Sequence, residues 1–89
     1  MKEQKVKIVN KLGLHARPAS LIVQTAMNFS SSIYIIKEES KIDAKSIMGI
    51  MMLAAACGTE LLLRAEGSDE DTALNKLAEL FNNGFGEEI

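Results

Sequence analysis

The feature that most constrains how this chain can fold is its alternation of short strand-like and helix-like hydrophobic patterns. Four segments alternate in polarity or are β-branched, as strands are; they are residues 5–9, 33–36, 41–44 and 60–66. Three segments carry apolar side chains at helical spacing; they are residues 16–28, 47–56 and 69–81. The predicted order of elements is therefore β-α-β-β-α-β-α.

Chain length and these one-sided patterns restrict the architecture further. Eighty-nine residues suffice for one core, so residues 1–89 are expected to form a single domain. One-sided strands and amphipathic helices bury their apolar faces together by stacking in two layers. We expect an α+β open-faced two-layer sandwich, in which three helices cover one face of a four-stranded antiparallel sheet. A ferredoxin-like β-α-β-β-α-β domain with an added C-terminal helix is the alternative that the element order leaves open.

Local signals predict where the later elements end. Gly58 stands where the second helix is expected to stop, and Ser68 is expected to cap the third helix. The tail, residues 82–89, is expected to fray.

Composition excludes several classes of function. The net charge is −2 without a basic block, which argues against nucleic-acid binding. One histidine and one cysteine, Cys57, provide neither a disulfide nor a zinc-ligand set, so we expect no metal or cofactor. No apolar run approaches the roughly 20 residues of a membrane span, and the charged first residues lack a signal-peptide core. We therefore expect a cytoplasmic protein without membrane insertion, and we expect Cys57 to be buried.

The only histidine and the only proline of the chain lie within one stretch, GLHARPAS. Gly13 permits a tight turn, and Pro18 fits the first turn of a helix. A helix that begins at His15 or Ala16 leaves the amides of Ala16 and Arg17 without partners inside the helix. An anion held on His15 would meet these amides, the positive end of the helix dipole and the Arg17 guanidinium.

These anion-binding groups around the His15 imidazole favour nucleophilic attack over proton transfer. Near neutral pH much of a histidine population is unprotonated and nucleophilic. No serine or cysteine stands directly beside His15 as an evident nucleophile, so attack on a phosphoryl group fits the imidazole better than proton shuttling. A surface histidine without function is the alternative that this stretch alone leaves open.

A second stretch, KSIMGIMML, begins the second helix. Ser46 stands at the N-cap position, where its hydroxyl would accept from the amide of Met48 or Gly49, and that role is an ordinary structural one. The helix is apolar nearly all round, so one packed face cannot cover all its large side chains. We expect a partly exposed, adaptable docking surface, drawn from Ile47, Met48, Met51 and Met52.

Together these stretches resemble the HPr family, the histidine-containing phosphocarriers of the bacterial phosphoenolpyruvate-dependent sugar phosphotransferase system. The resemblance spans essentially the whole chain, and the matching segments are residues 13–19, 45–49, 58–60 and 67–70. It implies the open-faced sandwich rather than the ferredoxin-like domain, and a monomer in the bacterial cytoplasm.

The resemblance also implies roles for particular residues. His15 would accept a phosphoryl group on Nδ1 from Enzyme I and pass it to sugar-specific IIA proteins or domains, while Arg17 steadies the phosphoryl oxygens. The protein would thus be a relay component rather than a free-standing enzyme. The Ser46 stretch resembles the Gram-positive form, in which an ATP-dependent HPr kinase/phosphorylase modifies that serine. Phospho-Ser46 then weakens phosphotransfer and promotes binding to the catabolite control protein, a transcription regulator.

Two other functions compete with the phosphocarrier. The protein could be purely regulatory through Ser46, although HPr-like proteins of that kind lack the active histidine. It could also be a small hydrolase that uses His15 with Ser20 or Ser46, but no acidic residue lies near either pair in the sequence to orient the imidazole.

Overall fold

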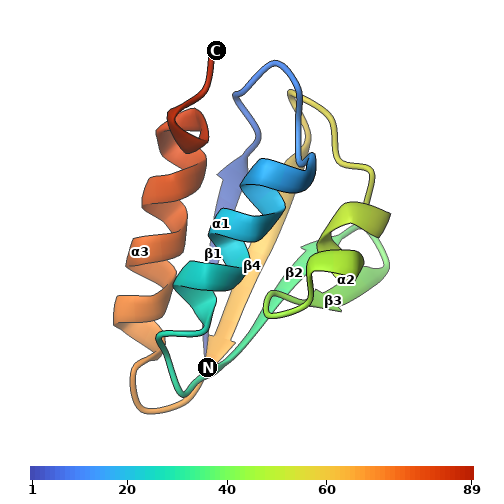
Figure 1. Ribbon diagram of the computed structural model, residues 1–89. Coiled ribbons are helices and arrows are strands. Elements are labelled where there is room, and N and C mark those ends of the chain that lie inside the picture. Colours follow the sequence, from blue (N-terminus) through green and yellow to red (C-terminus); the bar gives the residue numbers. More distant parts are fainter.

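Four strands and three helices follow one another in the order that the hydrophobic pattern predicts (Figure 1). The structure, a computed structural model, describes residues 1–89. Its elements are β1 (Lys2–Lys7), α1 (Ala16–Ala26), β2 (Ser32–Lys37), β3 (Ser40–Asp43), α2 (Ile47–Met52), β4 (Glu60–Glu66), α3 (Glu70–Asn82) and a short 3₁₀ turn, η1 (Gly84–Gly86).

The four strands form one sheet in the order β1-β4-β2-β3, and every neighbouring pair is antiparallel. All three helices lie on the same face of this sheet (Figure 1). The α+β open-faced sandwich is therefore confirmed. The ferredoxin-like alternative is wrong, because β1 is an edge strand that pairs with β4 alone.

The core lies between the sheet and the helices. Alternate residues of β2 and β4 face it, and each is at most 2% exposed; they are Ile33, Ile35, Leu61, Leu63 and Ala65. The helices contribute fully buried side chains from the opposite side; among them are Ile22, Leu77 and Phe81. Each large side chain buried in this way contributes about 1.5–3 kcal/mol to the hydrophobic stabilisation of the fold.

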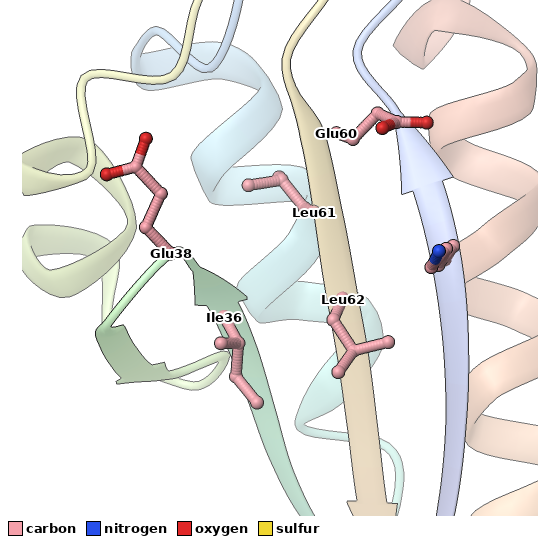
Figure 2. Close-up of a pocket in the computed structure, with 6 residues that line it drawn as sticks. Ile36, Glu38, Glu60, Leu61 and Leu62 are labelled. Atoms are coloured by element: carbon pink, nitrogen blue, oxygen red, sulfur yellow. The ribbon is translucent and has the colours of Figure 1, made fainter.

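The other face of the sheet is open. Ile36 and Leu62 are register partners on neighbouring strands, and they lie side by side there (Figure 2). Lys5, Glu38 and Glu60 help to line the same shallow pocket. Apolar and charged side chains are thus mixed around this shallow pocket.

Several expected element boundaries are wrong, and α1 ends at Ala26 rather than at residue 28. Helix α2 ends at Met52 rather than Ala56, because Ala54 takes a positive φ of 50° and the chain turns away. Gly58 therefore does not end the helix. Helix α3 begins at Glu70 and its N-cap residue is Asp69 rather than Ser68.

The expected start of the first strand also differs, since β1 begins at Lys2 rather than Lys5 and ends at Lys7. Its pairing continues past that end, because the Ile8 amide donates to the Thr59 carbonyl at 2.9 Å.

The C-terminal tail is ordered, which contradicts the expectation that it frays. Phe85 is 2% exposed, and its ring packs edge-to-face on Phe81 with the ring centroids 5.0 Å apart. Gly84, Phe85 and Gly86 all have positive φ angles, of 60°, 57° and 73°. These left-handed residues reverse the chain and return its end to the loop between β1 and α1.

Cys57 is exposed rather than buried. The segment between α2 and β4 crosses the surface, and only Leu53 and Ala55 of this segment place their side chains in the core. None of the helices has both the length and the hydropathy to cross a lipid bilayer.

Candidate functional site

The histidine loop owes its shape to Gly13. Its φ is +69°, and a Cβ atom there would lie 2.5 Å from the carbonyl oxygen of Ala55. The next residue, Leu14, is buried and donates its amide to the same carbonyl at 3.0 Å. The loop is therefore fastened to the segment after α2, and His15 follows it at the surface.

Helix α1 begins directly after His15, as the sequence predicts. His15 is the N-cap residue with extended backbone angles, and its side chain makes no capping hydrogen bond. The amides of Ala16 and Arg17 donate no hydrogen bond within the chain, and Pro18 has no amide hydrogen to donate. Two free donors and the positive helix end thus stand next to the imidazole.

A carboxylate from the far end of the chain joins His15 and Arg17. The Nε2 atom of His15 lies 2.9 Å and 2.8 Å from Oε1 and Oε2 of Glu87. The Arg17 guanidinium donates to Glu87 Oε2 at 3.0 Å and to the carbonyl of Phe85 at 2.8 Å. The site therefore brings His15, Arg17 and the Ala16 amide together, with Glu87 as a member that sequence reasoning missed.

Asn10 binds the Glu87 carboxylate from the buried side of the site. It is fully buried, and its Nδ2 atom donates to the Gly13 carbonyl at 2.8 Å and to Glu87 Oε1 at 3.0 Å. Its Oδ1 atom has no partner within the chain. Asn10 thus connects the backbone of the histidine loop to the C-terminal tail.

The electrostatics of the site are visible at Glu87. The hydrogen bond from His15 is the main cause that lowers the pKa of Glu87 below its ordinary value. Burial acts in the opposite direction, while the donors on Asn10 and Arg17 lower the pKa further. Glu87 is therefore ionised at neutral pH and presents an anion to the imidazole.

The imidazole remains accessible despite these contacts. The side chain of His15 is 37% exposed and that of Arg17 is 54% exposed. The Nδ1 atom of His15 makes no hydrogen bond within the chain. The ring therefore offers one unoccupied nitrogen to an incoming group.

Ser46 occupies the N-cap of α2, and its Oγ accepts from the Gly49 amide at 3.1 Å. The large apolar side chains of the short helix are exposed, and only Ile50 is buried. The exposed fractions are 43% for Ile47, 75% for Met48, 44% for Met51 and 79% for Met52. The expected Ser46 cap and the expected partial exposure of the large apolar side chains of α2 are both confirmed.

The arrangement does not support a serine hydrolase. Neither Ser20 nor Ser46 contacts the imidazole, since Ser20 Oγ accepts from Gln24 and Ser46 caps α2. The acidic partner of His15 is present as Glu87, but no serine completes a triad. No group of three or more His, Cys, Asp or Glu side chains is placed to hold a metal ion.

One signal in the sequence could have indicated Glu87. The motif GFG places an aromatic residue between two glycines near the end of the chain, and both glycines here adopt positive φ. A buried aromatic within a left-handed turn indicates a tail that folds back onto the domain.

Comparison with known proteins places the chain among phosphocarriers. Residues 2–83 match the family model described as the PTS HPr component phosphorylation site. The phosphocarrier protein HPr of Treponema pallidum is 51% identical over 83 residues, which cover 93% of this chain and 94% of that protein. The HPr-like protein Crh of Bacillus subtilis is 53% identical over 78 residues, or 88% of this chain and 92% of that protein.

Solved structures agree with the fold. The crystal structure of HPr-C-His from Thermoanaerobacter tengcongensis superposes with a TM-score of 0.95 at 53% identity, and the match covers 100% of both chains. The crystal structure of an HPr dimer from the same organism matches with a TM-score of 0.78 at 53% identity, over 98% of this chain and 100% of that one.

Proposed function

This chain belongs to the HPr family of phosphocarriers in the phosphotransferase system, and we propose that His15 is the residue that carries its phosphoryl group. Transfer through a phosphohistidine is the function of this family. The observation that supports His15 most strongly is its place at the start of α1, where Nδ1 has no partner beside the free amides of Ala16 and Arg17.

The chemistry follows from these groups. The lone pair of Nδ1 attacks phosphorus, and the phosphoryl oxygens meet the Ala16 and Arg17 amides at the positive end of α1. The Arg17 side chain is exposed enough to turn toward the same oxygens and add charge-assisted hydrogen bonds. The protein only holds the group and presents it again, so we propose that it acts as a relay component rather than as a free-standing enzyme.

We propose Enzyme I as the donor and sugar-specific IIA proteins or domains as the acceptors, in the bacterial cytoplasm. The exposed side chains of Ile47, Met48 and Met51 form the docking surface on α2, and the segment that follows this helix is hydrogen-bonded to the histidine loop. Donor and acceptor must use this face in turn, so each complex should be small and short-lived. The carrier itself is expected to be a monomer, which analytical ultracentrifugation would test.

Ser46 is proposed as a regulatory site for an HPr kinase/phosphorylase, with the catabolite control protein as the partner of the modified form. A phosphate on Ser46 would add about −1.5 to −2 charges at the start of α2. The helix terminus tolerates this charge, so the effect falls on partners that approach Met48 and Met51. The presence of Crh among the relatives supports a regulatory role beside phosphotransfer.

Incubation with phosphoenolpyruvate and Enzyme I tests the carrier function. We expect one acid-labile phosphate per chain, and none on a His15→Ala variant that keeps its circular dichroism and melting temperature. Ser20→Ala is the matched control, because it removes the other candidate nucleophile on the same helix, and it should be labelled as fully as the native protein. Acid-labile phosphate on His15→Ala would refute the assignment.

A second labelling experiment separates the carrier from a purely regulatory protein. ATP and the serine kinase should place an acid-stable phosphate on the native chain and on His15→Ala, but not on Ser46→Ala. If Enzyme I fails to label the chain while the kinase succeeds, the protein is a regulator only. If Ser46→Ala is still labelled by the kinase, the regulatory site lies elsewhere.

A further inference from the structure

The side chain of Glu87 is bound on three sides within the histidine site. Its oxygens lie within hydrogen-bond distance of His15 Nε2, Arg17 and Asn10, at 2.8–3.0 Å. The side chain is only 15% exposed, although its neighbours in the tail, Gly86 and Glu88, are exposed. Such complete use of one carboxylate indicates a specific role rather than a fortuitous surface contact.

The tail holds this carboxylate in place without help from the imidazole. Phe85 is buried in the core against Phe81. The glycines on either side of Phe85 have positive φ angles and allow the left-handed turn of η1. On the other side of Glu87, the Lys11 amide donates to the Glu88 carbonyl at 3.0 Å. Glu87 therefore stands between two anchors, and its position is set before a phosphoryl donor arrives.

The chemistry of the contact determines where the imidazole proton resides. An ionised carboxylate only accepts hydrogen bonds, so the nitrogen that faces Glu87 must carry a hydrogen. Neutral imidazole has a single ring hydrogen, which the contact assigns to Nε2. Nδ1 is then the nitrogen with the free lone pair. A carboxylate orients ligand and catalytic histidines in other proteins by the same hydrogen bond.

We propose that Glu87 is a positioning residue of the phosphoryl relay, which selects the Nε2–H tautomer of His15 and so presents Nδ1 as the nucleophile. This inference rests on the proposed function of His15 and names the group that prepares it. Asn10 and the η1 turn hold the carboxylate, while Arg17 is shared between Glu87 and the incoming phosphoryl group.

The transfer step balances without a base. The Nδ1 lone pair forms the new bond to phosphorus, while the bond between phosphorus and the donor breaks and its electron pair stays with the donor. No proton leaves His15, because Nδ1 carried none. The ring becomes cationic with its hydrogen still on Nε2, and the Glu87 carboxylate offsets this charge. When the group passes to an acceptor, the same steps run in reverse.

Nuclear magnetic resonance tests the tautomer without any partner protein. Long-range proton–nitrogen correlation spectra of the histidine ring distinguish a protonated nitrogen from a bare one. In the native protein with a neutral His15 ring, we expect a protonated Nε2 and a bare Nδ1. In Glu87→Ala, we expect the two tautomers to be mixed, with the melting temperature close to that of the native chain because Phe85 keeps the tail anchored.

Phosphotransfer provides the second measurement. From phosphorylated Enzyme I, Glu87→Ala should accept the group with a kcat/KM about tenfold below the native value, the effect of losing one hydrogen bond to a charged group. Glu87→Gln keeps an acceptor for Nε2–H but no charge, so it should restore the tautomer and only part of the rate. Glu88→Ala is the matched control, since it removes the neighbouring carboxylate, whose side chain is 76% exposed and pairs with Lys11 instead.

The outcomes separate this inference from the proposed function. A single Nε2–H tautomer in Glu87→Ala, or a rate equal to or above the native rate, would overturn the positioning role. An equal loss of rate in Glu88→Ala would also overturn it, because the effect would then belong to tail charge in general. If the native protein shows the expected tautomer but accepts no phosphate from Enzyme I, the carrier function fails while the tautomer assignment stands.

Discussion

Replacement of Phe85 by alanine tests whether the C-terminal tail is part of the folded domain. The ring is 2% exposed and packs edge-to-face on Phe81. Phenylalanine-to-alanine changes in cores cost about 3–5 kcal/mol, as lost transfer energy and a cavity combine. Because the ring lies near the chain end, where the tail can partly collapse into the space, we expect the lower limit, about 3 kcal/mol.

Urea unfolding measures this loss. For a domain of this size the dependence on denaturant is about 1 kcal/mol per molar urea, so the midpoint should fall by about 3 M. Phe85→Leu keeps most of the volume and should lose less than about 1.5 kcal/mol. Leu12→Ala is the surface control, since Leu12 is 75% exposed, and it should change stability by less than about 0.5 kcal/mol.

The same variant should loosen the histidine site. The Lys11 amide donates to the Glu88 carbonyl, so release of the tail should speed its hydrogen exchange while the amides of β4 stay protected. If Phe85→Ala loses no more stability than Leu12→Ala, the tail does not pack as described. The tail would then not hold the Glu87 carboxylate in place.

Three further predictions concern other positions. In Gly13→Ala, the new residue must adopt a φ of +69°, and its Cβ atom would lie 2.5 Å from the Ala55 carbonyl oxygen. We expect this variant to lose more than about 2 kcal/mol of free energy of unfolding, measured by thermal unfolding, and to accept phosphate more slowly. Gly86 has a similar φ, of +73°, but the atom nearest to a Cβ there is 3.8 Å away, so Gly86→Ala should lose only about 1 kcal/mol of free energy of unfolding. An equal loss of stability in the two glycine variants would contradict the clash at Gly13. Ser46→Ala should lose about 1 kcal/mol of stability in chemical denaturation through its cap, and no loss would show that the Gly49 amide needs no partner. Hydrogen bonds from Ser31 and Ser30 lower the pKa of Asp69 from 3.8 to about 2, so its stabilisation is full above about pH 4 and is lost as the pH falls toward 2. Acid unfolding of Asp69→Asn should accordingly depend less on pH than that of the native protein over this interval, and parallel curves would refute the assignment.

Much of the site could be predicted from neighbouring residues alone. The start of α1 after His15, the free amides of Ala16 and Arg17, and the Ser46 cap all depend on residues a few positions apart. Helix termini and capping bonds are local by nature, because the orphan amides and their partners share one turn. The alternation of apolar residues predicted the strands for the same reason.

Contacts between distant segments decided the rest. Sequence patterns set the order of elements, the open-faced layering and the chemistry available at His15. Only tertiary contacts explain why α2 is short, since the Ala55 carbonyl accepts from the Leu14 amide instead of continuing the helix. Tertiary contacts also place the Asp69 carboxylate where it accepts from the Ser30 and Ser31 amides. It also brought Glu87 to His15 across 72 positions. No local pattern encodes such a meeting, because it exists only after Phe85 is buried and the chain end turns back over the first loop.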